Sequence, residues 1–547
     1  MSCLAVNRKP PRKSMKDSIV AERQKSAGQG EKGRKHHQIT MKYISTRDSS
    51  LCSSFEQALF SGYAPDGGLF VPQSLPLLSL DELDSFSALN FSELAYAILC
   101  KFISPDEVPS DDLRNICKKS FHDGFDEECV VPVVKIGGSS TFVAELFHGP
   151  TMCFKDLGMQ GVIHLLTYFS AKRKQMACLL AATTGDTGPA AVQAVSQCNS
   201  PYLSCVIHYP LGQISDFQRR QMTTANSPIV KIVSFEGGGD DMDRPIKELL
   251  TDQECKVTKS SEVFLCGVNS YNVGRPIMQI VHFFWTYLRI CDQCGTKPGK
   301  LTLDLVIPAG ALGNTTAAYM AKKMGLPLGR ICLGTNVSDI THRVVATGEF
   351  HRADEMKKTL SEAINIQVPY NFERALYFLS GFNHVLIRNL MTKMDSTGKI
   401  DLEKELLEKL QAMFASARIT DDEMCSAMVN AKEKLGYFID PHTAVAFAAA
   451  DKLGYNPFAT EGSGANGQAV AIMATASPCK FEEAVTEALS VDGWNEYMNS
   501  SSFPKRASEC TRKDETTPFQ YTRAKGISLE EAQDEWKQKT LALVNEM

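Results

Sequence analysis

Lys155 is the residue of this chain whose surroundings most resemble those of a catalytic amine. It lies in residues 145–158, which read ELFHGPTMCFKDLG: a strand-like run ends, a Gly-Pro-Thr turn follows and a helix begins at the lysine. Apolar neighbours and the positive end of a helix both favour the neutral amine, the form that condenses with an aldehyde to a Schiff base. A lysine in a first helical turn is more often a solvated surface residue, so the assignment depends on the other turns.

Two further turns have the composition of anion sites. Residues 182–190 read ATTGDTGPA, whose hydroxyls and backbone N–H groups would meet a carboxylate or phosphate at a helix start, unless they only cap the turn. Residues 307–316 read IPAGALGNTT and predict a phosphate cradle. This run matches neither the dinucleotide nor the P-loop pattern, which disfavours NAD and ATP. A third cluster, Gly237–Gly239, precedes Asp240 and Asp241, whose charges would repel phosphate, and is predicted to be a flexible capped turn.

The elements around these turns alternate between strand and helix. Short β-branched runs predict strands at 141–147, 176–183, 203–209, 229–235, 301–307, 331–335 and 469–474. Helical patterns predict helices at 155–168, 189–197, 243–251, 273–290, 315–325 and 442–454. Such alternation is typical of parallel βαβ units, which bind ligands at the carboxyl ends of their strands. The predicted fold class is α/β.

A helix-initial lysine, a hydroxyl-rich anion turn and a phosphate cradle together indicate pyridoxal 5'-phosphate and an amino-acid substrate. Seven motifs, in this order, then resemble the threonine synthase family: FHGPTMCFKDLG, ATTGDTG, GVNSYNVGRPIMQ, IPAGALGN, IQVPYNFER, DPHTAV and ATASPCKF. The resemblance covers about residues 41–495, including the opening MKYISTRD and APDGGLFVP. It implies the pyridoxal-phosphate-dependent fold type II, similar to tryptophan synthase β, with two open α/β subdomains and an α-rich N-terminal domain.

The resemblance also implies roles for single residues. Lys155 would carry the cofactor and move the Cα proton. The implied cofactor-binding residues are Lys155, Asp186, Gly310, Ala311, Leu312, Gly313, Asn314 and Thr475. The implied substrate-binding residues are Thr184, Thr187, Asn269, Ser270, Asn272 and Lys480. Thr475 would face the pyridine nitrogen and leave it largely unprotonated, and Lys480 would meet the substrate phosphate. No metal is expected.

Three departures from the family pattern bear on the reaction. Biosynthetic members usually read TSGDTG, GNFGN or GNFGD, and IQVSSNFER, whereas this chain has Thr184, Ala311-Leu312 and Pro369-Tyr370. IQVPYN resembles the threonine synthase-like group of animals, whose implied activity is that of a phospho-lyase. The favoured prediction is therefore elimination of phosphate from O-phosphohomoserine or O-phosphothreonine, giving 2-oxobutyrate, ammonia and phosphate. Synthesis of threonine from O-phosphohomoserine, and a non-catalytic binding or signalling role, remain alternatives.

Four segments are predicted along the chain. They are a basic disordered extension at 1–40, an N-terminal domain at 41–140, a catalytic domain at 141–495 and a C-terminal extension at 496–547. Between about 385 and 437 we expect a helical insertion without strands, with helices at 402–413 and 421–435. The C-terminal extension is expected to contain one helix, at 528–544.

Composition limits the classes of partner. The chain has 547 residues, with 58 basic and 63 acidic ones, a net charge of −5. Residues 1–40 hold 10 basic and 3 acidic side chains. The body of the chain, residues 41–547, therefore holds 48 basic and 60 acidic side chains, a net charge of −12. That body lacks the basic excess of a nucleic-acid-binding protein, and no apolar run predicts a membrane span. The expected partner is a small phosphorylated amino acid, and the expected assembly is a monomer or homodimer.

The cysteines indicate a reducing compartment. The chain has 17, an odd number, scattered singly through apolar segments. Cys291 and Cys294 have the spacing of a zinc or redox pair, but further ligands are not nearby in the sequence. The basic N-terminus contains three acids and no sustained apolar face, which is a poor match to a mitochondrial leader. We expect a cytoplasmic location, with the mitochondrion as the alternative.

Overall fold

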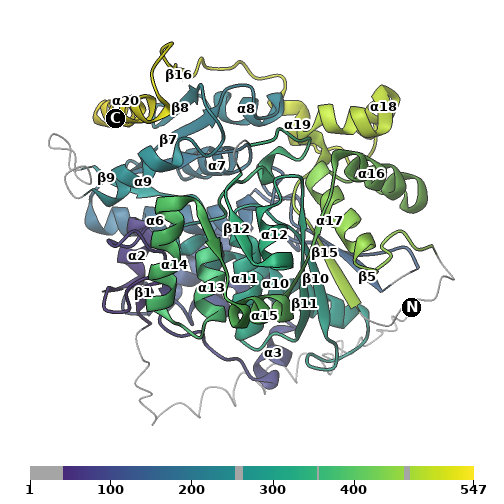
Figure 1. Cartoon of the computed structure of the whole chain (residues 1–547). Helices are drawn as coiled ribbons and strands as arrows, with labels where there is room; N and C mark the ends of the chain where they lie inside the picture. Colours follow the sequence, from purple (N-terminus) through teal and green to yellow (C-terminus); the bar gives the residue numbers. More distant parts are fainter. Residues whose placement is uncertain (1–40, 123, 139, 253–262, 354–355, 461–468) are drawn as a thin grey trace, which may run out of the picture. The chain divides into compact units, whose positions relative to one another are not determined.

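A six-stranded sheet forms half of the frame that carries the predicted turns (Figure 1). The computed structural model describes residues 41–547 except 123, 139, 253–262, 354–355 and 461–468. The strand order is β14 (Phe414–Arg418), β11 (Leu328–Thr335), β10 (Leu303–Pro308), β15 (Ala469–Ala474), β5 (Thr141–Glu145) and β4 (Val133–Ile136). All neighbours are parallel except β4 and β5. Helices cover both faces, so β10 and β15 are buried along their whole length and read as continuous apolar runs.

A five-stranded parallel sheet forms the other half. Its order is β16 (Phe519–Tyr521), β8 (Val230–Phe235), β7 (Leu203–Pro210), β6 (Ala177–Ala182) and β9 (Phe264–Gly267). Every strand predicted from the sequence is present in one of the two sheets. The strands of these two sheets that the sequence did not reveal are β4, β9, β14 and β16. All four are short and lie at sheet edges, where pairing with a neighbour rather than a long β-branched run defines them.

Residues 41–121 form a small antiparallel sheet with helices. The sheet contains β1 (Tyr43–Ser45), β2 (Cys52–Ser53) and β3 (Phe70–Pro72). Helix α2 (Phe55–Ser61) connects β2 to β3, and three helices follow β3: α3 (Leu80–Phe86), α4 (Phe91–Leu99) and α5 (Ser110–Ser120). Ser54, Ser79 and Asn90 begin three of these helices with capping boxes, in which side chain and backbone satisfy each other's hydrogen bonds.

The remaining helices connect and cover the two parallel sheets. They are α6 (Lys155–Arg173), α7 (Thr187–Cys198), α8 (Asp216–Thr223), α9 (Asp243–Thr251), α10 (Gly274–Gln293), α11 (Gly313–Lys323), α12 (Ile340–Thr347), α13 (Phe372–Leu379), α14 (His384–Thr397), α15 (Lys404–Met413), α16 (Asp421–Leu435), α17 (Pro441–Lys452), α18 (Glu482–Met498), α19 (Lys505–Cys510) and α20 (Leu529–Asn545). Within the described part of the chain, none of the helices is both long and apolar enough to cross a bilayer.

The expectation that strands stop between 385 and 437 was wrong. The strand β13 (Lys399–Asp401) pairs with β12 (Glu349–His351), and β14 pairs in parallel with β11 at the edge of the large sheet. The sequence of β14, FASAR, has little β-branched character, so its extended form depends on the neighbouring strand. The helices expected at 402–413 and 421–435 are present as α15 and α16.

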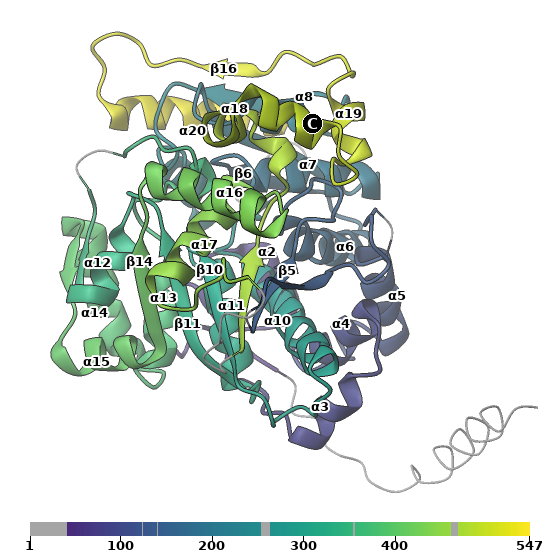
Figure 2. The same cartoon turned by 90° about the vertical axis from the view of Figure 1, so that its right-hand side faces the viewer.

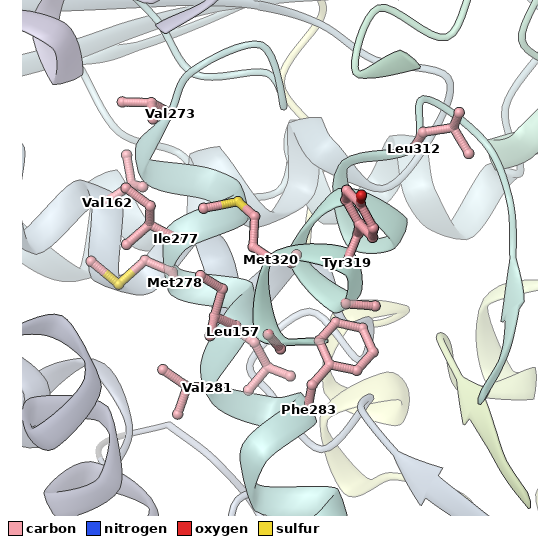
Figure 3. Packing of buried hydrophobic residues seen from close by; sticks show 14 of the residues in the cluster. Leu157, Val162, Val273, Ile277, Met278, Val281, Phe283, Leu312, Tyr319 and Met320 are labelled. Carbon is pink, nitrogen blue, oxygen red and sulfur yellow. The ribbon is translucent and has the colours of Figure 1, made fainter. Parts of the chain in front are cut away.

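Helices α6, α10 and α11, whose first residues carry quoted motifs, share one core (Figure 3). Leu157 of α6, Ile277 and Val281 of α10 and Met320 of α11 are all buried and lie close together. Gly161 of α6 leaves room for the side chain of Met278 of α10, because a Cβ there would lie 2.4 Å from Met278 Sδ in its present position. Burial of each such side chain contributes roughly 1.5–3 kcal/mol. This packing fixes the first residues of the three helices relative to one another.

Shortening a side chain at the centre of the large sheet should reduce stability. Ile472 is fully buried in β15, between β10 and β5. Ile472→Ala is expected to lower the free energy of unfolding by about 2–5 kcal/mol, because it leaves a cavity among packed neighbours. Urea unfolding followed by circular dichroism measures the change. Val491→Ala, at a position 61% exposed, is the control and should change it by less than about 0.5 kcal/mol; equal effects of the two would contradict the assigned core.

Candidate functional site

The predicted turns meet at one cavity between the two parallel sheets. Segments that follow β5, β6, β8, β9, β10 and β15 line a space of about 890 Å³, so strands of both sheets contribute their carboxyl ends. The sequence-predicted residues on its wall are Lys155, Thr184, Asp186, Thr187, Asn269, Ser270, Gly310, Ala311, Leu312, Gly313, Asn314 and Thr475. Two other predicted residues, Asn272 and Lys480, are not on the wall.

Lys155 is the first residue of α6 and its side chain lines the cavity. The turn before it is held by Asp156, whose two carboxylate oxygens accept from the Thr151 N–H (2.8 Å) and the Thr151 hydroxyl (2.7 Å). Burial lowers the pKa of Lys155 below its ordinary value, although the carboxylate of Asp186 acts in the opposite direction. The amine is therefore more readily neutral than that of a surface lysine, as a Schiff-base lysine requires.

The turn between β10 and α11 has the form of an anion cradle. Leu312 has φ +60°, a left-handed conformation uncommon for leucine, and α11 begins at the next residue. Gly313 must lack a side chain, because a Cβ there would lie 2.8 Å from the Cβ of Ser270. The turn thus directs backbone N–H groups and the positive end of a helix into the cavity.

A buried amide in this cradle has a free donor. Asn314 Oδ1 accepts from Nε2 of His282 at 2.8 Å, and burial lowers the pKa of His282 to about 3, so the ring is neutral. Asn314 Nδ2 is buried and has no hydrogen-bond partner among the described residues. An unpaired buried N–H is costly, and a phosphate oxygen in the cradle would satisfy it.

Lys480 is an ion-pair partner of Asp186 rather than a residue of the cavity wall. Its Nζ lies 2.7 Å from Asp186 Oδ1 and donates to the Thr151 carbonyl at 3.0 Å, and the side chain is fully buried. Burial opposes the charge of Lys480, but Asp186 raises its pKa above the ordinary value. Burial likewise opposes the charge of Asp186, whose pKa Lys480 and Lys155 lower. The expected contact of Lys480 with a substrate phosphate has no support in this placement, because its charge is already neutralised.

Asn272 joins two parts of the fold. Its Nδ2 donates to the carbonyls of Leu59 (2.7 Å) and Gly267 (2.8 Å), and its Oδ1 accepts from the N–H of Gly274 (3.0 Å). These bonds use the donors and an acceptor of the amide and cap the start of α10. The structure therefore gives Asn272 a structural position, not the substrate contact expected from the motif.

The sequence reading missed Arg275, which lies on the cavity wall two residues into α10. Its guanidinium is 1% exposed and donates to the Val268 carbonyl at 2.9 Å, while Nε is buried without a partner among the described residues. Burial lowers the pKa of Arg275 to about 10. A buried guanidinium without a carboxylate partner is suited to bind an anion. The sequence does contain an indication of this residue, because Arg275 is a charged side chain at the start of a largely apolar predicted helix, within GVNSYNVGRPIMQ.

The turn after β8, which was expected to be a flexible capped turn that repels phosphate, also belongs to the wall. Gly239, Asp240 and Asp243 line the cavity, and Asp240 Oδ2 accepts from the N–H of Gln367 at 3.1 Å. Burial raises the pKa of Asp240 to about 6. Burial and the charge of Asp240 raise the pKa of Asp243 well above its ordinary value. With raised pKa values, Asp240 and Asp243 carry less negative charge than surface acids, which weakens their repulsion of a phosphate.

Two residues of quoted motifs complete the wall. Tyr370 packs its ring against Tyr271, with centroids 5.7 Å apart. His442 has a fixed tautomer, since Nδ1 donates to Asp440 Oδ2 at 2.8 Å and Nε2 accepts from the Ala363 N–H at 3.0 Å. Among the described residues, no cluster of three or more His, Cys, Asp or Glu side chains could hold a metal ion.

Comparison with known families identifies the chain. A domain described as "Threonine synthase N terminus" matches residues 42–121, and one described as "Pyridoxal-phosphate dependent enzyme" matches residues 132–464. The bacterial threonine synthase of Pseudomonas aeruginosa is 33% identical over 452 residues, which cover 82% of this chain and 90% of that protein. The chain belongs to the threonine synthase family of pyridoxal-phosphate-dependent enzymes.

Other family members agree in sequence and in structure. Human "Threonine synthase-like 2" is 36% identical over 406 residues, covering 74% of this chain and 82% of that protein. The crystal structure of yeast threonine synthase superposes with a TM-score of 0.77 at 29% identity, covering 92% of this chain and 99% of that one. The pyridoxal-phosphate-bound threonine synthase from Brucella melitensis has the same TM-score and identity, covering 91% and 99%. The predicted fold type and cofactor are thereby confirmed.

The cavity fits this cofactor through residues of three segments. The amine of Lys155 suits its aldehyde, the cradle at Gly310–Asn314 with the free donor of Asn314 suits its phosphate, and the hydroxyl of Thr475 suits its ring nitrogen. Each group lies on the wall of the same cavity.

The lowered pKa of Lys155 predicts how cofactor uptake depends on pH. Only the neutral amine reacts with the aldehyde, so the rate at which cofactor-free protein binds pyridoxal phosphate should rise with pH and level off below about 10.4, the ordinary lysine pKa. Stopped-flow absorbance measures the rate. After borohydride reduction and dialysis, the wild type and exposed Lys172→Ala should retain the near-ultraviolet absorbance of a covalently attached pyridoxyl group, whereas Lys155→Ala should retain none. A rate that is still rising at pH 10.4 would contradict the assignment.

Proposed function

We propose that the protein eliminates phosphate from O-phosphohomoserine or O-phosphothreonine, taking up one water and releasing 2-oxobutyrate, ammonia and phosphate. The observation that carries this proposal is the position of Tyr370 on the cavity wall. Threonine synthase, named in relatives such as the Pseudomonas aeruginosa protein at 33% identity, is the second candidate. Both reactions would use the same cofactor and the same first steps.

The cavity offers each part of such a substrate a complementary group. Bound pyridoxal phosphate would withdraw electrons from Cα of the amino acid. Lys155, more readily neutral than a surface lysine, is positioned to accept the Cα proton. The hydroxyls of Thr184 and Thr187, at the start of α7, suit the substrate carboxylate. Arg275, without a carboxylate partner among the described residues, suits the phosphate that leaves.

Tyr370 favours elimination over synthesis. A synthase must admit water to Cβ of the bound substrate and keep the amino group, whereas a lyase releases an enamine that water hydrolyses. Tyr370 stands where biosynthetic members have a small hydroxyl residue, and the apolar Ile364 and Ile366 share its wall. A phenol ring occupies more of the cavity than a serine side chain would, and so leaves less room for an ordered water. A shift of about 1–3 kcal/mol between the two barriers decides the product, since 1.36 kcal/mol is tenfold in rate.

Product analysis tests the proposal. Purified protein with pyridoxal phosphate is supplied with each substrate, and phosphate, 2-oxobutyrate, ammonia and threonine are measured. We expect equal amounts of the first three, and Tyr370→Ser should yield a larger share of threonine from O-phosphohomoserine. Lys155→Ala is the inactive control. Threonine as the main product of the wild type would establish the synthase instead, and absence of visible cofactor absorbance in the native protein would support a non-catalytic role.

Arg275 should determine affinity for the phosphorylated substrate. Arg275→Met keeps the length of the side chain but removes the charge, and a hydrogen bond to a charged group is worth about 1.5–3 kcal/mol. We expect KM to rise about 10- to 150-fold while the visible absorbance of the cofactor is retained. Lys297→Met, at a lysine whose side chain is 80% exposed, is the control. An unchanged KM would exclude Arg275 as the partner of the substrate phosphate.

A further inference from the structure

The C-terminal helix α20 lies against the back of one wall of the cavity. This wall, the segment Gly237–Asp243, joins β8 to α9 and places Gly239, Asp240 and Asp243 at the cavity. In Figure 1 α20, at the yellow end of the chain, lies beside β7, β8 and α9. More than 280 residues of sequence separate α20 from the wall that it contacts.

Gln533 makes the direct contact. Its Nε2 donates to the backbone carbonyl of Asp241 at 2.7 Å, and the residue is 9% exposed. The carboxylate of Asp241 accepts from the N–H of Gly238 at 2.6 Å, which closes the turn. The amide of Gln533 therefore holds the residue next to Asp240 from outside the cavity.

Trp536, one helical turn further, packs on the start of the same wall. Its ring lies 5.5 Å from that of Phe235 between centroids, and a Cβ on Gly237 would come within 3.2 Å of the indole. The tryptophan is fully buried. It limits how far the wall can move outward.

The helix is itself anchored to the body. Lys537 pairs with Glu248 of α9 at 2.6 Å, Arg244 pairs with Asp534, and the Thr540 hydroxyl hydrogen-bonds Nε2 of His208 in β7 at 3.0 Å. Several anchors on two elements make α20 a fixed support rather than a loosely attached end.

The cavity side of the wall is held by substrate-binding segments. The N–H of Gln367 donates to Asp240 Oδ2 at 3.1 Å, and a Cβ on Gly239 would lie 2.7 Å from Cγ2 of Thr184. A small outward shift of the wall would thus change the distance between Asp240 and the turn that carries Thr184 and Thr187.

We infer that Gln533 is a positioning residue, which sets the substrate side of the cavity by holding the Gly237–Asp243 wall through the Asp241 carbonyl. The substrate used to test this rests on the proposed function, but the position of the wall does not. The cofactor cradle at Gly310–Asn314 belongs to the other sheet, so cofactor binding should be independent of Gln533.

Hydrogen exchange and kinetics test the inference together. Gln533→Ala and Gln533→Glu both remove the donor, and a hydrogen bond of ordinary strength predicts amide exchange in residues 237–243 about 2- to 10-fold faster. KM should rise by a similar factor while kcat changes less than about twofold and the Kd for pyridoxal phosphate is unchanged. Gln533→Lys, which keeps a donor, should restore both values. Gln538→Ala, at an exposed position of the same helix, is the matched control.

The exchange measurement is made on the holoenzyme without substrate, so it decides the inference even if the proposed reaction fails. Should both donor-free variants match Gln538→Ala in exchange and in KM, Gln533 does not position the wall. Should they instead lower Tm and raise exchange throughout the protein, its role is only to stabilise the fold.

Discussion

The ion pair of Asp186 with Lys480 sets the electrostatics of the cavity. The carboxylate of Asp186 interacts with two lysines, Lys155 and Lys480. Lys480 Nζ forms an ion pair with Asp186 Oδ1 at 2.7 Å, and Gln218 Nε2 donates to the same oxygen at 3.0 Å. A buried carboxylate without such partners would cost several kcal/mol. Because Lys480 satisfies Asp186 from behind the wall, Lys155 is not held as the carboxylate's main counter-ion, and burial can lower its pKa. The nucleophilic role proposed for Lys155 thus depends on Lys480, which does not line the cavity.

The same arrangement explains how an acidic protein can hold the cofactor phosphate and, in the reaction proposed above, a substrate phosphate. The body carries a net charge of −12, yet the cavity wall presents Lys155, Arg275 and the amino-terminal end of α11. Asp240 and Asp243, which would oppose an anion, have raised pKa values and are less charged than surface acids. At contact distance in a buried site, these local groups outweigh the screened average of the surface.

Packing places the charged groups and holds them. The starts of α6, α10 and α11 carry Lys155, Arg275 and the cradle, and the core shared by these helices leaves little freedom for any one of them to move alone (Figure 3). Figure 2, turned by 90° from Figure 1, shows these helices and β5, β10 and β15 close together in the middle of the body. The proposed substrate side of the cavity is formed by other elements, namely the Gly237–Asp243 segment after β8 and Tyr370. Helix α20 contacts the Gly237–Asp243 segment from outside the cavity. Under the proposed assignments, cofactor affinity and substrate preference are therefore determined by different structural elements.

The sequence by itself determined the parts of the site that are local. A strand, a glycine turn and a helix start are adjacent in the chain, so Lys155, the Thr184–Thr187 turn and the Gly310–Asn314 cradle could be found from residue type and spacing. Tertiary structure decided what depends on partners from elsewhere. Lys480 and Asn272 look like ligand-binding residues within their motifs, but Asp186, Leu59 and Gly267 occupy their polar groups. The turn that carries Asp240 has the sequence of a flexible capped turn, but Gln367 and Gln533 of α20 form hydrogen bonds to it. The short strands β14 and β16 likewise exist because a neighbouring edge pairs with them. The physical reason is the same in each case: burial and hydrogen-bond partners, which set charge state and availability, are contributed by residues far away in the chain.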